Sequence, residues 1–116
     1  MDADDGSHLR RLTHGFAYNE HASFSPDGRH IVWMTNLDNR NGGTDWWIMN
    51  ADGSNPRQLT HLNQTGYGDS THAPVYACLT NWSANGTQLL GAIQYSPLKQ
   101  EGRIFLMTLD PSLLQP

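Results

Sequence analysis

The sequence predicts an all-β fold built from repeated units of short antiparallel strands. The first observation is a repeated turn phrase: Ser25-Pro26-Asp27-Gly28 follows an aromatic residue and precedes an apolar run, and Ser83-Ala84-Asn85-Gly86 does the same later in the chain. The second is that the apolar runs are short, rich in β-branched and aromatic residues, and bounded by turn residues. The third is that no segment carries a long apolar stripe at helical spacing. Because a repeat unit cannot bury its own hydrophobic face, the units are expected to pack on one another.

The predicted strands follow from the turn signals that bound them. The aromatic residue before each Ser-x-x-Gly phrase ends one strand, and the apolar run after the phrase begins the next. Gly28 and Gly86 are expected in a left-handed conformation, where the absence of a Cβ atom avoids a steric clash. The predicted strands are 9–13, 20–24, 30–35, 45–50, 56–60, 76–82, 88–94 and 103–108.

A second repeated phrase sets the order of the strands. Residues 49–60 contain Met-Asn-Ala-Asp-Gly-Ser followed by Arg-x-Leu-Thr, residues 1–13 carry the same phrase with one extra Asp, and residues 104–111 carry a weaker copy. If the strands of a unit are called A to D, the chain contains D, then A-B-C-D, then A-B-C. The predicted division is therefore an outer strand of a preceding or closing unit in 1–14, a first unit in 15–61, and a second unit in 62–116 that lacks its outer strand.

These phrases resemble the repeat of TolB-like β-propellers, the WD-repeat-like propellers of bacteria. The resemblance covers nearly the whole chain. It implies a partial β-propeller of two four-stranded antiparallel blades in the strand order D-ABCD-ABC. It also implies a binding or scaffolding role in the bacterial envelope, in a periplasmic or extracellular location, with a protein or glycan contacted through the channel rim and loops. A repeat of this kind specifies a fold better than a function.

The length of 116 residues accounts for about two blades, whereas a propeller ring usually has four to eight. Two interpretations follow. Either the chain is a piece of a longer propeller, which its start inside a repeated phrase favours, or identical chains assemble, for example as a trimer that forms a six-blade ring. No signal peptide is evident in this chain, because acidic residues follow Met1.

The composition argues against two classes of partner. The formal net charge is −4 and only 7 residues are Lys or Arg, so a cationic surface for nucleic acid is not expected. No apolar stretch is long enough to span a membrane. The single cysteine, Cys78, lies in a predicted inner strand and is expected to be a buried, unreactive thiol. No motif implies a cofactor.

The candidate ligand-binding residues lie where the chain enters the innermost strand of each blade. They are Asn19, Glu20 and His21 for the first blade, and Asp69 and His72 for the second. Because these strands and their entry loops surround the central channel of a propeller, we expect the candidate side chains to converge near one rim. There they would hold a divalent ion or polarise a sugar or peptide group. The alternative is a solvated rim without a ligand, and since no spacing matches a zinc motif, no metal is assigned.

The remaining histidines are expected to have structural or surface roles. His14 and His61 follow Leu-Thr in two units, so a hydrogen bond at a turn or strand end is expected for both. His8 and His30 have polar neighbours and are expected to be exposed.

The pair Trp46-Trp47 is expected to divide between the two faces of one strand. Successive side chains of a strand point to opposite faces, so the two indoles cannot enter the same core. One indole is therefore expected between the blades, and the other on the opposite face of the sheet.

The sequence favours a non-catalytic binding or scaffolding module, and no catalytic residue is assigned. The alternative is a piece of a propeller enzyme, either a metal-dependent polysaccharide lyase or the gating propeller of a serine peptidase. A Gly-x-Ser-x-Gly nucleophile motif does not occur. The enzyme alternative requires Glu20, His21, Asp69 and His72 to lie within ligand distance of one ion.

Overall fold

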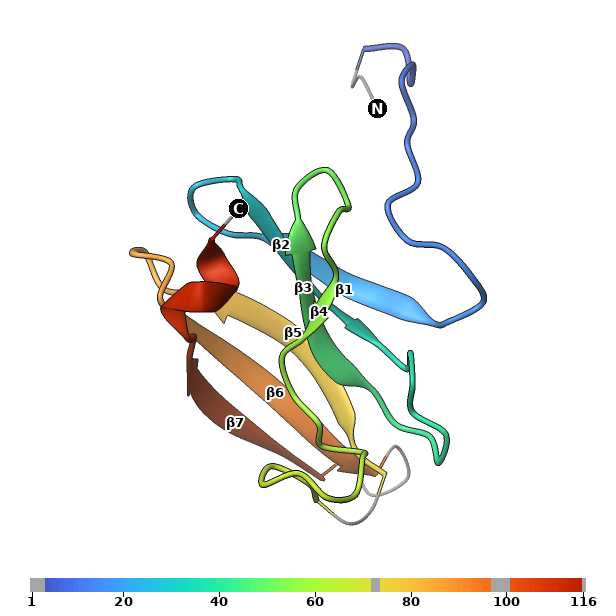
Figure 1. Cartoon of the computed structure of the whole chain (residues 1–116), viewed down its shortest axis with the longest axis vertical. Helices are drawn as coiled ribbons and strands as arrows, with labels where there is room; N and C mark the ends of the chain where they lie inside the picture. The colour runs from blue at the N-terminus through green and yellow to red at the C-terminus, as the bar shows by residue number, and fades with distance from the viewer. Residues whose placement is uncertain (1–3, 72–73, 97–100, 116) are drawn as a thin grey trace.

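The chain forms two antiparallel sheets that pack against each other (Figure 1). The computed structural model describes residues 4–71, 74–96 and 101–115. The first sheet has the order β1-β2-β3-β4 and the second β5-β6-β7, so strands adjacent in sequence are adjacent in space. No helix of the described residues is long and apolar enough to cross a membrane. The elements are β1 (Asn19–Phe24), β2 (His30–Thr35), β3 (Asp45–Asn50), β4 (Arg57–Gln58), β5 (Tyr76–Trp82), β6 (Gln88–Ser96), β7 (Glu101–Thr108) and the 3-10 helix η1 (Pro111–Leu114).

The all-β fold with two units in A-B-C order is confirmed, and β2, β3 and β5 agree with the predicted ranges at both ends. Two predicted outer strands differ from the structure. β4 contains only Arg57–Gln58 in place of 56–60. Residues 9–13 are not a strand, because a strand needs a hydrogen-bonding neighbour and this segment is not part of either sheet.

The two repeated turns use the same hydrogen bonds with different residues. In the first, the carboxylate of Asp27 accepts hydrogen bonds from the Ser25 hydroxyl at 2.6 Å and the Arg29 N–H at 3.0 Å. In the second, the amide oxygen of Asn85 accepts from the Ser83 hydroxyl at 2.8 Å. The glycines that follow have φ of 72° at Gly28 and 73° at Gly86, which confirms the predicted left-handed conformation. The turn therefore needs an acceptor at this position more than it needs a charge.

An Asp27→Asn variant is expected to melt near the wild-type temperature at neutral pH, because Asn85 performs the same role. The hydrogen bond from Ser25 lowers the pKa of Asp27 below its ordinary value of 3.8. A lowered pKa contributes stability that is present above the ordinary value and is lost as the pH falls through the folded value. The variant should therefore lose less stability than the wild type in that acidic range. The melting temperatures of the two proteins, followed by circular dichroism across a range of pH, measure this difference. If both melting temperatures fall equally as the pH is lowered, the expectation is contradicted.

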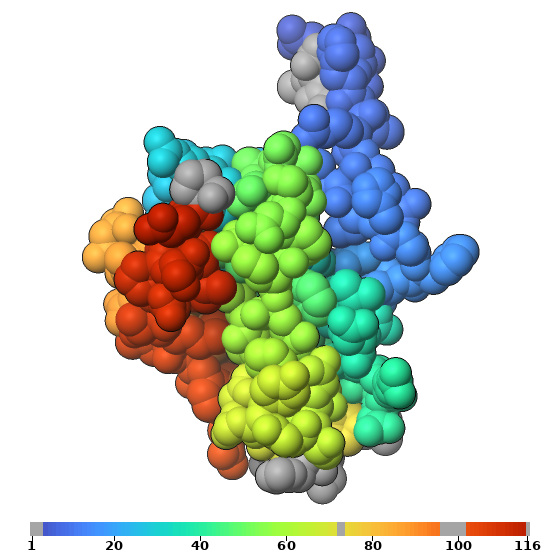
Figure 2. Space-filling model, in the orientation of Figure 1, coloured from blue at the N-terminus to red at the C-terminus, as the bar shows by residue number. Residues whose placement is uncertain are grey.

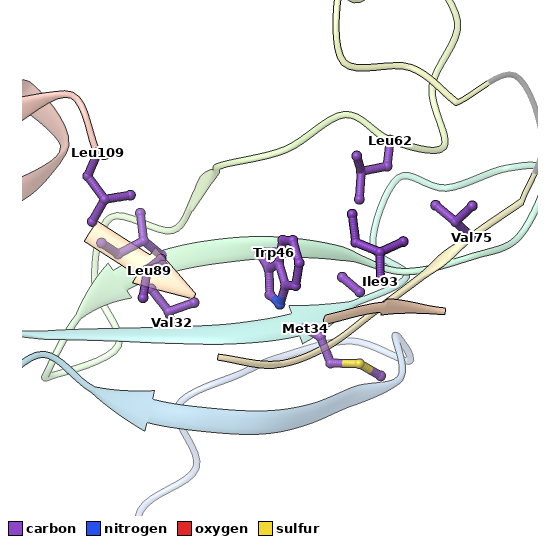
Figure 3. Packing of buried hydrophobic residues seen from close by; sticks show 10 residues of the cluster. Val32, Met34, Trp46, Leu62, Val75, Leu89, Ile93 and Leu109 are labelled. Atoms are coloured by element: carbon purple, nitrogen blue, oxygen red, sulfur yellow. The ribbon is translucent and has the colours of Figure 1, made fainter. Parts of the chain in front are cut away.

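The main core lies between the two sheets (Figure 3). Trp46 of β3 is at its centre, 1% exposed, and its indole N–H donates to the carbonyl of Cys78 at 2.7 Å. A Cβ atom on Gly91 of β6 would lie 2.7 Å from this ring, so the glycine leaves the space that the indole fills. The buried members are Val32, Met34, Trp46, Ile48, Leu62, Val75, Ala77, Leu89, Ile93 and Leu109.

A second apolar cluster covers the opposite face of the first sheet. It consists of Ile31, Trp33, Trp47 and Met49, with Leu12 of the amino-terminal segment packed against it. The predicted division of the tryptophan pair is confirmed, because Trp46 belongs to the core between the sheets and Trp47 to this cluster. The first sheet is therefore apolar on both faces, as a blade between two neighbours would be.

A buried carboxylate holds the connection between the two sheets. Asp45 at the start of β3 is fully buried, and its two oxygens accept four hydrogen bonds. Such a charge is tolerated in the interior only when its hydrogen bonds are satisfied. The donors are the Thr60 hydroxyl at 2.8 Å, the Leu62 N–H at 2.7 Å, the Asn39 amide at 3.0 Å and the Asn63 amide at 3.1 Å.

Candidate functional site

The first strands of the two sheets meet on the side of the molecule that faces the channel in a propeller. β1 and β5 are edge strands, each the first in its sheet. The hydroxyls of Ser23 and Thr80 lie 3.3 Å apart across this contact. Three of the candidate residues, Asn19, Glu20 and His21, therefore lie at the start of an inner edge strand, as the sequence predicts.

A β-bulge in β1 sets the direction of these side chains. The pairing with β2 shifts register between Glu20 and Ser23. His21 lies within the shift and has a φ of 54°, a left-handed conformation that is uncommon for a residue with a side chain. Bulges bend a strand and redirect its side chains, and backbone strain of this kind concentrates at functional sites. β5 has a similar shift between Ala77 and Thr80, so the bulge also belongs to the blade repeat.

Glu20 is the centre of a small polar cluster. Its Oε2 accepts a hydrogen bond from the Tyr18 hydroxyl at 2.8 Å and lies 3.3 Å from Nε2 of His21. The hydrogen bond to Glu20 raises the pKa of Tyr18 above its ordinary 10.0, and desolvation and the negative charge of Glu20 add to the effect. The side chains of Glu20 and His21 are 50% and 32% exposed, so the carboxylate and the imidazole are accessible to a ligand.

Asn19 has a structural role in this site. Its amide oxygen accepts a hydrogen bond from the indole N–H of Trp33 at 2.9 Å, and its amide nitrogen donates to the carbonyl of Ala17 at 2.8 Å. These two bonds fix the entry of the chain into β1 and the orientation of Trp33. Asn19 therefore positions the site, while Glu20 and His21 present the exposed polar groups.

A cleft of about 260 Å³ lies beside the cluster, between β1 and the amino-terminal segment. One wall is apolar and comes from the second cluster, and the other carries the candidate polar groups. This combination can hold a ligand through van der Waals contact on one side and hydrogen bonds to a carboxylate and an imidazole on the other. The lining residues are Leu12, Thr13, Asn19, Glu20, His21, Ala22, Ile31, Trp33 and Met49.

Asp69 belongs to a different group of side chains. Its Oδ2 accepts a hydrogen bond from the backbone N–H of His61 at 2.6 Å, and its Oδ1 lies 3.8 Å from Nδ1 of the same histidine. The imidazole of His61 stacks on Tyr67 with ring centroids 3.9 Å apart. His61 therefore has a role in the loop between the sheets, as its repeated position predicts.

The structure places Asn19, Glu20 and His21 together at the start of β1 and Asp69 against His61 in the loop between the sheets. His72 lies outside the described residues. In the parts of the chain that the structure describes, no three His, Cys, Asp or Glu side chains form a group that could hold a metal ion, and Asp69 does not join Glu20 and His21 in one.

His30 is a correction to the sequence analysis. It is 2% exposed, although its polar neighbours predict an exposed side chain. The reason is its place at the start of β2, a central strand whose two faces are both covered. Cys78 is partly buried, and desolvation raises the pKa of its thiol above the ordinary 9.0, which disfavours the nucleophilic thiolate.

Comparisons with known proteins agree with this fold. No family model matches the chain. In sequence it is similar to an uncharacterized protein of Agrobacterium fabrum, with 38% identity over 69 residues, which are 60% of this chain and 21% of the relative. In structure it is similar to a candidate TolB from Agrobacterium tumefaciens, with a TM-score of 0.62 and 23% identity over 85% of this chain and 32% of that chain. The chain has the fold of TolB-like propeller blades. It spans only 21% and 32% of the lengths of these two proteins.

Two further residues belong to this site and were not among the predicted candidates. Tyr18 supplies the hydroxyl that binds Glu20, and Leu12 forms part of the apolar wall. A signal for Tyr18 exists, because in an extended chain residues two apart share a face and Tyr18 lies two before Glu20. Leu12 carries no such signal, since its contact depends on how the amino-terminal segment folds over the first sheet.

Proposed function

We propose that this chain is a non-catalytic binding module of a TolB-like propeller, and that it contacts a protein or glycan through the Tyr18–Glu20–His21 cluster at its channel side. The observation that supports this most is the hydrogen-bonded, partly exposed cluster beside a cleft with an apolar wall. A carboxylate and an imidazole can bind the hydroxyls of a sugar or the amide and ammonium groups of a peptide. The apolar wall suits the carbon face of either ligand.

The location and the completion of the blades are part of this proposal. The resemblance to TolB-like propellers favours a periplasmic or extracellular location. The two blades would be completed either by further blades of a longer polypeptide or by other copies of the chain. Asp69 and His72, in the connection between the blades, would contribute a second set of ligand contacts at the rim.

The test is a titration of the isotope-labelled protein with two panels, soluble oligosaccharides and short peptides, followed by amide chemical shifts. Ligands are expected to shift the amides of residues 18–21, and the panel that does so identifies the ligand class. A Glu20→Gln variant keeps the shape of the side chain and loses its charge, so it should bind at least tenfold more weakly, which corresponds to about 1.4 kcal/mol.

The matched control is Asp38→Asn, which removes an exposed carboxylate elsewhere and keeps a residue suited to its φ of 63°. It should bind as the wild type does. The proposal is overturned if no ligand of either panel shifts residues 18–21, or if Glu20→Gln and Asp38→Asn weaken binding equally.

A further inference from the structure

The two repeated turns lie side by side at one end of the molecule. The turn of residues 25–28 connects β1 to β2, and the turn of residues 83–86 connects β5 to β6. A Cβ atom on Gly86 would lie 3.7 Å from Cδ of Pro26, so little space separates the turns at this point. Figure 2 shows the first turn (cyan), the second turn (light orange) and η1 (red) gathered together. This end of β1 is opposite to the end that carries Glu20.

A pocket of about 310 Å³ lies between the two turns. Residues 25–27 form one side, residues 84–86 form the other, and His30 and Leu114 complete the lining. Both sheets contribute to the pocket, so its shape depends on how the sheets pack against each other. It shares no lining residue with the cleft beside Glu20.

Asp27 gives this pocket a negative charge and an unused acceptor. The hydrogen bonds from the Ser25 hydroxyl and the Arg29 N–H both end on its Oδ1, and within the described residues its Oδ2 accepts none. The hydrogen bond from Ser25 lowers the pKa of Asp27 below its ordinary 3.8, so the carboxylate is charged at neutral pH. No lysine or arginine is among the described residues that line the pocket. The pocket therefore favours a positively charged group.

His30 supplies a second, independent observation. Its side chain is 2% exposed, and its Nε2 atom is buried without a hydrogen-bond partner among the described residues. Buried polar atoms normally have a partner, so an unpartnered one in a pocket wall points to a group supplied from outside. The repeat equivalent in the second blade, Gln88, donates its side-chain amide to Thr108 at 3.3 Å. Because Nε2 of His30 has no partner to lose, the ring can turn toward a ligand without breaking a hydrogen bond.

We propose that this pocket binds an arginine side chain of a partner protein. The guanidinium presents several N–H donors in one plane, so it reaches two acceptors at once, Oδ2 of Asp27 and Nε2 of the neutral His30. The aliphatic stem packs on Pro26 and Leu114. Charge complementarity selects this occupant, because the pocket carries a carboxylate and the chain has a formal net charge of −4. The site lies at the other end of β1 from the cluster around Glu20, so it does not depend on the ligand proposed above.

The test is a titration of the isotope-labelled full chain with a short, acetylated and amidated peptide that carries one arginine among glycine and serine residues. Amide chemical shifts are expected to change at residues 27–30 and 84–86, and not at residues 18–21. A matched peptide replaces the arginine with citrulline, which has nearly the same shape and no charge. It should bind roughly fivefold more weakly or worse, because it cannot form the ion pair with Asp27.

Two variants of the chain change the charge of the pocket in opposite directions. Asp27→Asn should weaken binding of the arginine peptide roughly fivefold or more. The turn is kept in this variant, because Asn85 accepts the same hydrogen bonds in the second turn. Asn85→Asp adds a carboxylate to the opposite side of the pocket and should strengthen binding. The control, Asp38→Asn, removes a carboxylate outside the pocket and should bind as the wild type does.

Three results would overturn the proposal. They are an arginine peptide that shifts no residue of the two turns, a citrulline peptide that binds as tightly as the arginine peptide, and an equal loss of binding in Asp27→Asn and Asp38→Asn. None of them bears on the cluster around Glu20, whose ligand is tested by shifts at residues 18–21 and by Glu20→Gln.

Discussion

Replacing Asp45 with alanine is expected to destabilise the protein by about 4 kcal/mol, a large part of the stability of a small domain. The carboxylate is fully buried and accepts four hydrogen bonds, so its removal leaves the donors of Asn39, Thr60, Leu62 and Asn63 without their acceptor. Denaturant unfolding at one fixed protein concentration measures the loss.

An Asp45→Asn variant is the matched control. It keeps the volume and one acceptor oxygen, but it turns one acceptor into a donor that faces other donors. It should therefore lose about 1–3 kcal/mol, less than the alanine variant. Equal losses for the two variants, or a loss below about 1 kcal/mol for alanine, would show that the network does not hold the connection between the sheets.

Adding a single methyl group at Gly91 is expected to have the second large effect. The Cβ atom of a Gly91→Ala variant would lie 2.7 and 2.8 Å from two ring atoms of Trp46, in the centre of the core. Overpacking of this kind typically costs about 1–3 kcal/mol. Thermal and denaturant unfolding should show the loss without a change in the far-ultraviolet spectrum.

A double-mutant cycle assigns this loss to Trp46. A Trp46→Leu variant removes the ring, so Gly91→Ala should cost much less in that background, with a coupling of at least about 1 kcal/mol. If the two changes are additive, the space between Gly91 and Trp46 does not set the distance between the sheets.

Local signals in the sequence predict the strands of each unit well. The turn phrase at Ser25 and Ser83 places the β1–β2 and β5–β6 connections, because its hydrogen bonds lie within five residues. The alternation of side chains along β3 correctly predicts that Trp46 and Trp47 lie on opposite faces of the first sheet. These features depend on neighbours in sequence, and the repeat supplies two independent copies of each.

Features that depend on distant partners are predicted less well. Residues 9–13 have the sequence of an outer strand, but a strand forms only beside a partner. The burial of His30 depends on coverage of both faces of β2. Asp69 does not lie with Glu20 and His21, because its carboxylate binds the backbone N–H of His61. The conformation of the loop that brings these two residues together cannot be predicted from the sequence. Glu20 and His21 are adjacent in sequence, and Oε2 of the first lies 3.3 Å from Nε2 of the second.

The central claim is that the two sheets have the fold of neighbouring propeller blades and pack on each other through the core around Trp46. The most direct test is nuclear magnetic resonance of the isotope-labelled chain, which detects protons that lie close together across the two sheets. We expect nuclear Overhauser contacts between the ring protons of Trp46 in the first sheet and the α-protons of Gly91 in the second, because the space beside Gly91 is filled by this ring. A folded chain without these contacts would contradict the packing of the two sheets.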